Sequence, residues 1–432
     1  MDKFYYDESG QLHCEGVAVE KIIEKVGTPF YLYSINSLRD HFQRFHKAFE
    51  SLNPLICFSL KSLNNLELIK ELVALGSGVD TVSGGELYLS KASGVDMSKV
   101  VYAGIGKTDA EISMAIDWQI GLINVESEQE FENISRIAKE KQKPIKAALR
   151  VTPDVIDART HDYTKTGYRG SKFGVDIERA KQFFSTYGQD EFVKLEGIHI
   201  HIGSPTYSAE PYVKAIQRVI DLVDYLTEQG HEISVLDIGG GYAADYNSGD
   251  SLSWQDYADS IIPLLLPYVN KGVQIVMEPG RTLAANSGIL VGSVNYVKKG
   301  GDKTFAILDT GMHHLIRPSL YQASHFIWPV KTDIIPEHRL IGEKREGLVP
   351  YDVVGPICES ADFLAKDRYL PPLERGDHLA VFTSGAYGMV MSSQYNAMPR
   401  PAEIMIDQDK VIVIRKRESY EDLISHIDNI EV

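Results

Sequence analysis

Apolar runs of strand length alternate with helical patterns from residue 55 to residue 277, and this alternation most constrains the fold. The first run, Leu55-Ile-Cys-Phe-Ser-Leu60, is followed by a helical pattern over residues 66–73. Strands that alternate with helices build parallel sheets, and eight of them can close into a β/α barrel, although an open doubly wound sheet shows the same alternation. We favour the barrel because about eight runs occur. The others cover residues 79–82, 100–103, 121–125, 147–151, 195–201, 233–238 and 273–277.

The chain changes character after residue 284, where β-like runs follow one another with little helical pattern between them. These runs cover residues 291–297, 304–308, 351–354, 378–382 and 411–414. We therefore predict an α/β protein with a (β/α)8 TIM-type barrel over residues 36–283. Residues 1–35 and 284–432 are predicted to form a second, mainly antiparallel β domain. Within these segments we expect a helix over residues 17–26, a strand over residues 30–33 and a terminal helix over residues 419–426.

The composition limits the classes of function. The 432 residues are 44% hydrophobic and carry a net charge of −16 without a Lys/Arg cluster, which argues against a nucleic-acid or anionic-membrane surface and favours a small-molecule ligand. No apolar stretch approaches the ~20 residues of a membrane-spanning helix. Cys14, Cys57 and Cys358 are widely spaced, and the N-terminus lacks the apolar run of a signal peptide. We therefore expect a protein of the reducing cytoplasm.

Polar and glycine-rich sequences stand where several predicted strands end. Lys61 follows the first strand, and the last three run into His201-Ile-Gly-Ser204, Gly239-Gly-Gly-Tyr242 and Glu278-Pro-Gly-Arg281. The C-terminal strand ends of a barrel carry its active site, and glycine-rich loops after strands seven and eight commonly bind phosphate. Each feature alone has an ordinary explanation, such as a solvated lysine, a core histidine or a flexible turn. Their joint placement predicts a site for a phosphate group.

A lysine, a carboxylate, an imidazole and a phosphate site in one barrel mouth suit pyridoxal phosphate. Lys61 would form the Schiff base, which requires a neutral amine. Glu278 would pair with the pyridine nitrogen and keep it protonated, so that the ring accepts the electrons released at the substrate's α-carbon. His201 would stack on the face of the ring. We therefore predict pyridoxal 5'-phosphate as the cofactor.

Short motifs in a fixed order cover nearly the whole chain. They occupy residues 27–34, 58–61, 82–86, 171–174, 199–204, 237–242, 278–281, 317–321, 355–360 and 385–388. As an ordered set they resemble the alanine-racemase-like, fold-type III pyridoxal-phosphate decarboxylases, and within them the diaminopimelate decarboxylase family. The resemblance implies a pyridoxal-phosphate-dependent amino-acid decarboxylase that converts meso-2,6-diaminopimelate to L-lysine and carbon dioxide, the last step of lysine biosynthesis.

The resemblance also implies a role for each matching residue. Lys61 matches the Schiff-base lysine, His201 the stacking histidine and Glu278 the partner of the pyridine nitrogen. Further cofactor contacts match Ser204, Gly239, Gly240, Gly241, Gly280, Arg281 and Tyr387. Substrate contacts match Arg281, Arg317, Tyr321, Glu359 and Tyr387. Cys358 and Glu359 match residues that family members donate across a dimer interface, so we expect a homodimer with shared active sites and Cys358 as the candidate catalytic proton donor.

The charges agree with this substrate. Its far end carries a carboxylate and an ammonium group, which Arg281 or Arg317 together with Glu359 would bind. A decarboxylase of ornithine, lysine or arginine is the alternative, but such relatives typically have aspartate where this chain has Glu359. The chain departs from the family's Tyr-Ala-Val-Lys-Ala-Asn at Ser59, Ser62 and Leu63, and Pro205 replaces a frequent glutamine. These departures lie beside cofactor residues and bear on substrate choice more than on reaction type.

Two other interpretations differ in class. His199 and His201 stand two residues apart and point to the same side of a strand, as in a metal-dependent hydrolase, but few further ligands occur at other strand ends. The second interpretation is a binding or regulatory homologue that has lost catalysis. The presence of both Lys61 and Cys358 argues against it.

Overall fold

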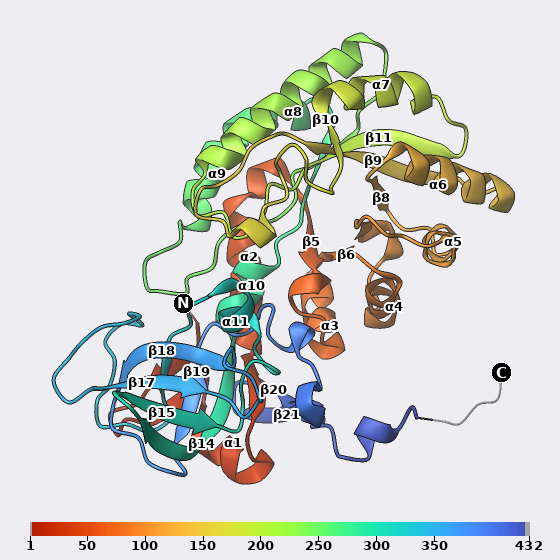
Figure 1. The fold of residues 1–432 in the computed structure, drawn as a ribbon. Coiled ribbons are helices and arrows are strands. Elements are labelled where there is room, and N and C mark those ends of the chain that lie inside the picture. Colours follow the sequence, from red (N-terminus) through yellow and green to blue (C-terminus); the bar gives the residue numbers. More distant parts are fainter. Residues whose placement is uncertain (1, 428–432) are drawn as a thin grey trace. The chain divides into compact units, whose positions relative to one another are not determined.

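The chain forms two compact units, which a computed structural model describes over residues 2–427. One unit contains His41–Ala244 and Ser251–Leu283. The other contains the chain up to Asp40, the short segment Asp245–Asp250 and the chain from Ala284 onward. Each unit is built around its own sheet (Figure 1).

The first unit is a closed barrel of eight parallel strands. In chain order these are β5 (Leu55–Ser59), β6 (Gly78–Thr81), β7 (Val100–Tyr102), β8 (Leu122–Val125), β9 (Ile145–Thr152), β11 (Val193–His199), β12 (Val235–Asp237) and β13 (Gln274–Met277). The last strand pairs with the first through Val276 and Leu55, which closes the ring, and β10 (Val175–Asp176) pairs with β9. The prediction of a barrel is confirmed, and the open sheet is excluded by this closing pair.

Helices surround the barrel strands (Figure 1). They are α2 (Ile35–Ala48), α3 (Leu66–Ala74), α4 (Gly84–Ser93), α5 (Asp109–Asp117), α6 (Glu128–Lys141), α7 (Ile177–Tyr187), α8 (Glu210–Glu228), α9 (Trp254–Val269) and the short α10 (Arg281–Ala284). Helix α6 shows why these segments are helical. Ser127 caps its first turn by accepting the Glu130 N–H, and Phe131, Ile134 and Ile137 recur on the buried face.

Small apolar side chains fill the interior of the barrel below its C-terminal mouth. They form one buried cluster of Cys57, Val101, Leu122, Ala148 and Val276. Two residues later on four of these strands stand polar residues, namely Ser59, Asn124, Arg150 and Glu278. Because side chains at i and i+2 of a strand point to the same face, the polar residues form a layer directly above the apolar cluster.

The second unit is a mainly antiparallel sheet. Its strands run in the order β18-β17-β15-β14-β4-β20-β21, and β19 pairs with both β14 and β16. The bounds are β4 (Phe30–Ser34), β14 (Gly288–Gly300), β15 (Lys303–Leu308), β16 (Ile327–Pro329), β17 (Val349–Val354), β18 (Phe363–Leu370), β19 (His378–Val381), β20 (Ala402–Asp407) and β21 (Lys410–Arg415). The remaining elements of this unit are β1 (Phe4–Tyr6), β2 (Leu12–Cys14), β3 (Val17–Ala18), α1 (Val19–Val26) and α11 (Arg317–Tyr321).

One predicted helix is wrong. Residues 419–426 contain only a single 3-10 turn, Asp422–Ile424. Tyr420 and Ile424 are exposed, so no apolar face is buried, and a helix this short is marginal without such packing. Among residues 2–427 no helix combines the length and the apolar character that crossing a membrane requires.

Candidate active site

Strand register brings the polar residues of the barrel mouth together. Ser59 of β5 lies opposite Asp80 of β6. His199 of β11 lies opposite Asp237 of β12, and Glu278 directly follows β13, the next strand in the ring. The parallel strands thus place carboxylates, a histidine and a serine from five neighbouring strands in one buried layer.

Lys61 stands at the edge of this layer. It lies in the 3-10 turn Leu60–Ser62 that follows β5, and its Nζ is 2.5 Å from Oδ2 of Asp80. The Ser59 hydroxyl donates to the same oxygen at 2.6 Å. Burial and the nearby Glu278 raise the pKa of Asp80, while Lys61 and Ser59 oppose that rise. Asp80 was not among the predicted site residues, although an acidic residue within the strand-like run of residues 79–82 was a usable signal.

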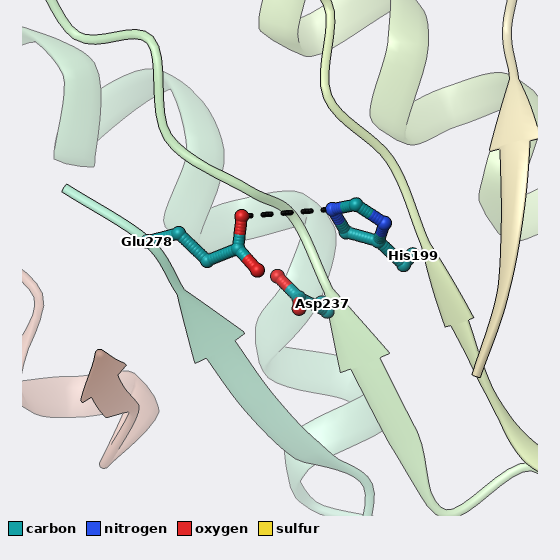
Figure 2. A group of neighbouring side chains, drawn as sticks. All are labelled: His199, Asp237 and Glu278. Atoms are coloured by element: carbon teal, nitrogen blue, oxygen red, sulfur yellow. Dashed lines mark ion pairs between the residues drawn. The ribbon is translucent and has the colours of Figure 1, made fainter. Parts of the chain in front are cut away.

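Figure 2 shows the centre of the layer, where His199, Asp237 and Glu278 meet. One ligand-type atom from each of the three lies within 4.8 Å of the others, and Nε2 of His199 is 3.6 Å from Oε2 of Glu278. Burial raises the pKa of Asp237 well above its usual value, and the neighbouring Glu278 raises it further. Burial alone would raise the pKa of Glu278 too, but His199, Lys61 and a hydrogen bond from Asp237 outweigh it and lower that pKa. The surroundings therefore shift the pKa values of the two carboxyl groups in opposite directions.

His201 follows β11 and contacts the glycine-rich loop. The Gly240 N–H donates to its Nδ1 at 3.3 Å. Burial, Lys61 and Arg150 hold the pKa of His201 well below its usual range, so the imidazole is neutral. A Cβ on Gly240 would lie 2.0 Å from the Glu278 carbonyl oxygen, and one on Gly241, at φ +102°, would lie 2.2 Å from the Gly203 carbonyl oxygen. Only glycine permits these approaches, which keep the loop close to the mouth.

The segment after β13 packs tightly on the turn that carries Lys61. A Cβ on Gly280 would come within 2.8 Å of Ser62 Oγ and 2.9 Å of Ser59 Cβ. Arg281, which begins α10, is buried and donates through Nε to Ser204 Oγ at 3.0 Å. Ser204, Gly280 and Arg281 thus belong to the same barrel mouth as Lys61.

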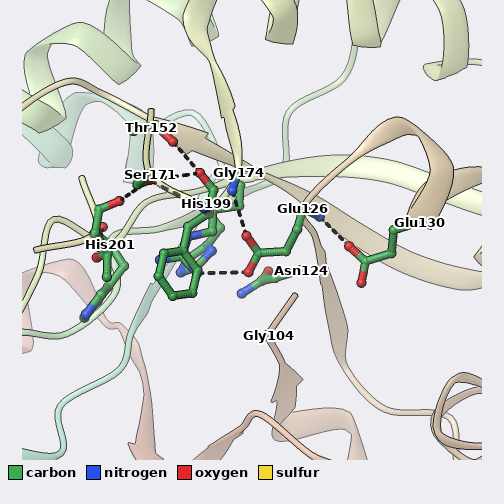
Figure 3. Close-up of polar contacts among 12 residues, drawn as sticks. Gly104, Asn124, Glu126, Glu130, Thr152, Ser171, Gly174, His199 and His201 are labelled. Atoms are coloured by element: carbon green, nitrogen blue, oxygen red, sulfur yellow. Dashed lines mark hydrogen bonds and ion pairs between the residues drawn. The ribbon is translucent and has the colours of Figure 1, made fainter. Parts of the chain in front are cut away.

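A second set of polar contacts holds the loop of residues 171–174 over the mouth (Figure 3). Glu126 accepts from Arg150 at 2.9 Å and from the Gly174 N–H at 2.8 Å. The Thr152 hydroxyl donates to the Phe173 carbonyl at 2.8 Å. The guanidinium of Arg150 lies 4.4 Å from the centre of the Phe173 ring. These contacts give the motif at residues 171–174 a structural purpose that its sequence alone did not reveal.

Five of the predicted site residues belong to the β unit: Arg317, Tyr321, Cys358, Glu359 and Tyr387. Arg317 is buried at the start of α11, and its guanidinium lies 4.6 Å from the centre of the Tyr246 ring. Its Nη1 is 2.8 Å from Nε2 of His325, whose Nδ1 is 2.8 Å from the Phe382 carbonyl. Because that carbonyl only accepts, Nδ1 carries the proton and Nε2 accepts from Arg317. Tyr321 ends the same helix.

Cys358 lies exposed on a loop that Asp362 organises. The Asp362 carboxylate accepts the N–H groups of Ile357 and Met312, each at 2.6 Å. The Cys358 N–H donates to Oδ1 of Asn396 at 2.9 Å, and the Tyr395 hydroxyl donates to Glu359. Tyr387 has a positive φ of 54°. The loop therefore presents a thiol and a carboxylate at neighbouring positions on a fixed backbone.

Comparisons with known proteins agree with this geometry. Residues 35–285 match the family of pyridoxal-dependent decarboxylases, pyridoxal binding domain. Diaminopimelate decarboxylase of Aquifex aeolicus is 44% identical over 95% of this chain and 94% of its own length. The crystal structure of the Helicobacter pylori diaminopimelate decarboxylase complexed with L-lysine matches with a TM-score of 0.87 at 37% identity, covering 94% of this chain and 98% of that one.

A more distant structure shows the fold alone. The lysine/ornithine decarboxylase of Vibrio vulnificus complexed with putrescine matches with a TM-score of 0.77 at 22% identity, over 90% of this chain and 97% of that one. The predictions of a pyridoxal-phosphate cofactor and of a decarboxylase are confirmed by the matched domain and by the nearly full-length relatives. The chain belongs to the diaminopimelate decarboxylase family of pyridoxal-dependent decarboxylases.

Proposed function

We propose that this protein decarboxylates meso-2,6-diaminopimelate to L-lysine and carbon dioxide. The observation that carries the proposal is the placement of Lys61 at the edge of the buried layer that holds Glu278 at the barrel mouth. Two comparisons support this choice of substrate. The nearly full-length relatives are diaminopimelate decarboxylases, and the Helicobacter pylori structure is a complex with L-lysine.

The barrel residues fit pyridoxal phosphate. Gly240 and Gly241 leave room where a Cβ would clash, and their loop supplies backbone N–H groups suited to a phosphate. Lys61 supplies the amine for the covalent bond to the cofactor, with Asp80 as the neighbour that accepts its proton. The cofactor supplies an electron sink when bound. Glu278 would hold a proton on the pyridine nitrogen of the bound cofactor, and the neutral His201 would lie against the ring without adding charge.

The β-unit residues supply the groups that recognise the far end of the substrate. Arg317 presents a guanidinium that is held by His325 and Tyr246, and Glu359 presents a carboxylate. A carboxylate and an ammonium group at the far end of diaminopimelate match this pair. Ornithine and lysine have only the ammonium group, so the guanidinium would disfavour them. Arg281 and Tyr321 complete the proposed substrate contacts, and Tyr387 would contact both substrate and cofactor.

We also propose a homodimer whose active sites each combine the barrel of one subunit with Cys358 and Glu359 of its partner. Cys358 is exposed, as a residue that reaches a second subunit must be, and its thiol suits protonation of the α-carbon after carbon dioxide leaves. The three free cysteines support our proposal of a cytoplasmic location.

The metal-dependent hydrolase is not favoured by the comparisons. His199 does lie beside Asp237 and Glu278, which are ligand types for a metal. The family match instead assigns this barrel to pyridoxal chemistry.

The direct test measures lysine and carbon dioxide formed from meso-diaminopimelate by the purified protein. Ornithine, lysine and arginine are assayed in parallel. We expect diaminopimelate to be turned over far faster than the other three. Equal or faster turnover of ornithine would overturn the substrate assignment, and the absence of a pyridoxal absorbance band would overturn the cofactor role.

A change at Arg317 tests the proposed specificity. Removing one charge from a charge-assisted contact typically costs about 2 to 4 kcal/mol. Arg317→Ala is therefore expected to depress turnover of diaminopimelate far more than any residual turnover of ornithine. Arg375→Ala is the matched control, because Arg375 is an exposed arginine of the same unit. An equal loss of turnover for both substrates would show that Arg317 does not recognise the far end of the substrate.

A further inference from the structure

Three acidic side chains are buried in the polar layer of the barrel, and their charges are not balanced. Asp80 and Asp237 are 0% exposed and Glu278 is 3% exposed. Lys61 forms its ion pair with Asp80. Within residues 2–427 no Lys, Arg or His lies within ion-pair distance of Asp237. Asp237 and Glu278 are buried neighbours and no such cation neutralises Asp237, so ionising both would bring two like charges together, and we expect one of them to hold a proton.

Asp237 and Glu278 face each other at the centre of this layer (Figure 2). Their oxygens lie within 4.8 Å of each other, together with a ring nitrogen of His199. Oε1 of Glu278 is buried and has no hydrogen-bond donor among the described residues. Two ionised carboxylates at this position would each present only acceptors. A single proton between them would turn a repulsive contact into a hydrogen bond.

The surroundings decide which carboxyl carries that proton. His199 Nε2 lies 3.6 Å from Glu278 and Lys61 also acts on Glu278, and both interactions favour the ionised form of Glu278. Apart from its neighbours Glu278 and His199, the hydrogen-bond partners of Asp237 are neutral: the Gly239 N–H donates to its Oδ1 at 2.9 Å, and Nδ2 of Asn124 lies 3.4 Å from its Oδ2. The hydrogen bond to Oδ1 is the shorter of the two, so Oδ1 is assigned as the carbonyl oxygen of the protonated carboxyl. Oδ2 then carries the proton.

We propose that Asp237 is protonated in the native protein and donates a hydrogen bond to Glu278, which makes Asp237 the positioning residue that keeps Glu278 ionised. The opposite directions of the two pKa values, raised for Asp237 and lowered for Glu278, agree with this assignment. The consequence for catalysis rests on the role proposed above for Glu278 toward the pyridine nitrogen. The location of the proton on Asp237 does not depend on that role.

Infrared spectroscopy locates the proton directly. A protonated carboxyl absorbs apart from carboxylates, and the band moves in D2O and with 13C-labelled aspartate. We expect such a band at neutral pH in the full-length protein carrying Glu86→Gln, both with and without cofactor. This background removes the Glu86 carboxyl, whose pKa of about 7 would otherwise add a protonated glutamate. The band should shift with labelled aspartate but not with labelled glutamate, disappear in Asp237→Asn and survive in Asp80→Asn. A band that follows labelled glutamate, a band lost in Asp80→Asn instead, or no protonated carboxyl at all would each overturn the proposal.

A functional readout separates positioning from simple packing. Asparagine at position 237 keeps the size of the side chain and an N–H donor toward Glu278, whereas alanine removes the donor. Asp237→Asn should therefore retain at least tenfold more turnover and tenfold tighter cofactor binding than Asp237→Ala, since one hydrogen bond to a charged group is worth about that factor. Equal losses in both variants would contradict positioning by hydrogen bonding. If the infrared results hold but Glu278→Gln keeps normal turnover, the role proposed for Glu278 fails and the proton assignment stands.

Discussion

Lys61 is the residue on which the proposed chemistry depends most. Its Nζ lies 2.5 Å from Asp80 at the barrel mouth, and this ion pair competes with covalent attachment of the cofactor. Lys61→Ala is expected to abolish the absorbance band of bound cofactor and essentially all decarboxylation, while the fold survives. Borohydride reduction followed by digestion and mass spectrometry should find the pyridoxyl group on Lys61 in the unmodified protein.

The control for Lys61 is Lys70→Ala. Lys70 lies on α3 and forms an exposed pair with Glu67, so its loss should leave the spectrum and the turnover unchanged. A pyridoxyl adduct on any other lysine would show that Lys61 is misassigned.

Glu278 gives the second prediction at this scale. Replacing it by glutamine keeps the volume but removes the negative charge that holds a proton on the pyridine nitrogen. Glu278→Gln should bind cofactor yet lose about 3 kcal/mol of transition-state stabilisation, or about a hundredfold in kcat. Turnover is measured beside the absorbance spectrum, so that loss of cofactor is not mistaken for loss of catalysis. Turnover near that of the unmodified protein would refute the role.

Residues at strand ends were predictable because a barrel gathers them at one mouth. Lys61, His201 and Glu278 were singled out on that ground, and the structure places all three at the barrel mouth. Asp80 and Asp237 were missed, since each lies inside an apolar run where it looked like an ordinary strand residue. Their importance depends on strand register, which pairs Ser59 with Asp80 and His199 with Asp237, and register is not visible in one sequence.

At the scale of elements, helix α4 carries a titrating group at its first turn. Glu86 accepts the Val82 N–H at 2.8 Å, and burial, opposed by that bond, raises its pKa to about 7. A carboxyl whose pKa is raised in the folded state binds more protons there than in the unfolded chain between about pH 4.5 and 7. Ionising Glu86 therefore destabilises the fold increasingly as the pH rises through that window.

Glu86→Gln tests this sign. Glutamine does not titrate, so the variant should gain about 1 to 3 kcal/mol of stability relative to the unmodified protein between pH 5 and pH 8, measured by urea unfolding at both values. Glu111→Gln is the matched control, because the bonds to the Thr108 and Gly84 N–H groups outweigh partial burial and lower the pKa of Glu111. Glu111 is thus ionised throughout the window, so the difference in stability between Glu111→Gln and the unmodified protein should be the same at both pH values. If the stability difference for Glu86→Gln were also the same at both pH values, the raised pKa of Glu86 would be contradicted.

Elements with a buried face were predictable and those without one were not. All eight barrel strands were expected within a few residues of their observed bounds, because their runs are rich in apolar residues and bounded by turn or helical patterns. The predicted helix over residues 419–426 failed because periodicity alone does not stabilise a short segment whose apolar residues stay exposed. Strands β18 and β20 were missed, since charged residues such as Lys366 and Glu403 interrupt their patterns.

At the scale of the whole molecule, the proposed active site draws on residues from both units of the chain. Lys61 and the cofactor residues belong to the barrel, whereas Arg317, Cys358 and Tyr387 belong to the β unit. Such a division allows either a site within one chain or a site shared between two subunits. A single sequence does not distinguish the two, because both demand the same residues.

Mixing two inactive variants distinguishes these arrangements. Lys61→Ala lacks the cofactor lysine and Cys358→Ala lacks the proposed proton donor, so each homodimer should be inactive. If subunits exchange at random, half of the dimers contain one chain of each kind. In a shared-site dimer of this mixed kind, one site receives native Lys61 from one chain and native Cys358 from the other, while the second site receives neither. About a quarter of all sites should therefore recover activity, measured as lysine formed after exchange has been verified by mass-tagged subunits. A mixture as inactive as its parents would place Lys61 and Cys358 of each site on the same chain.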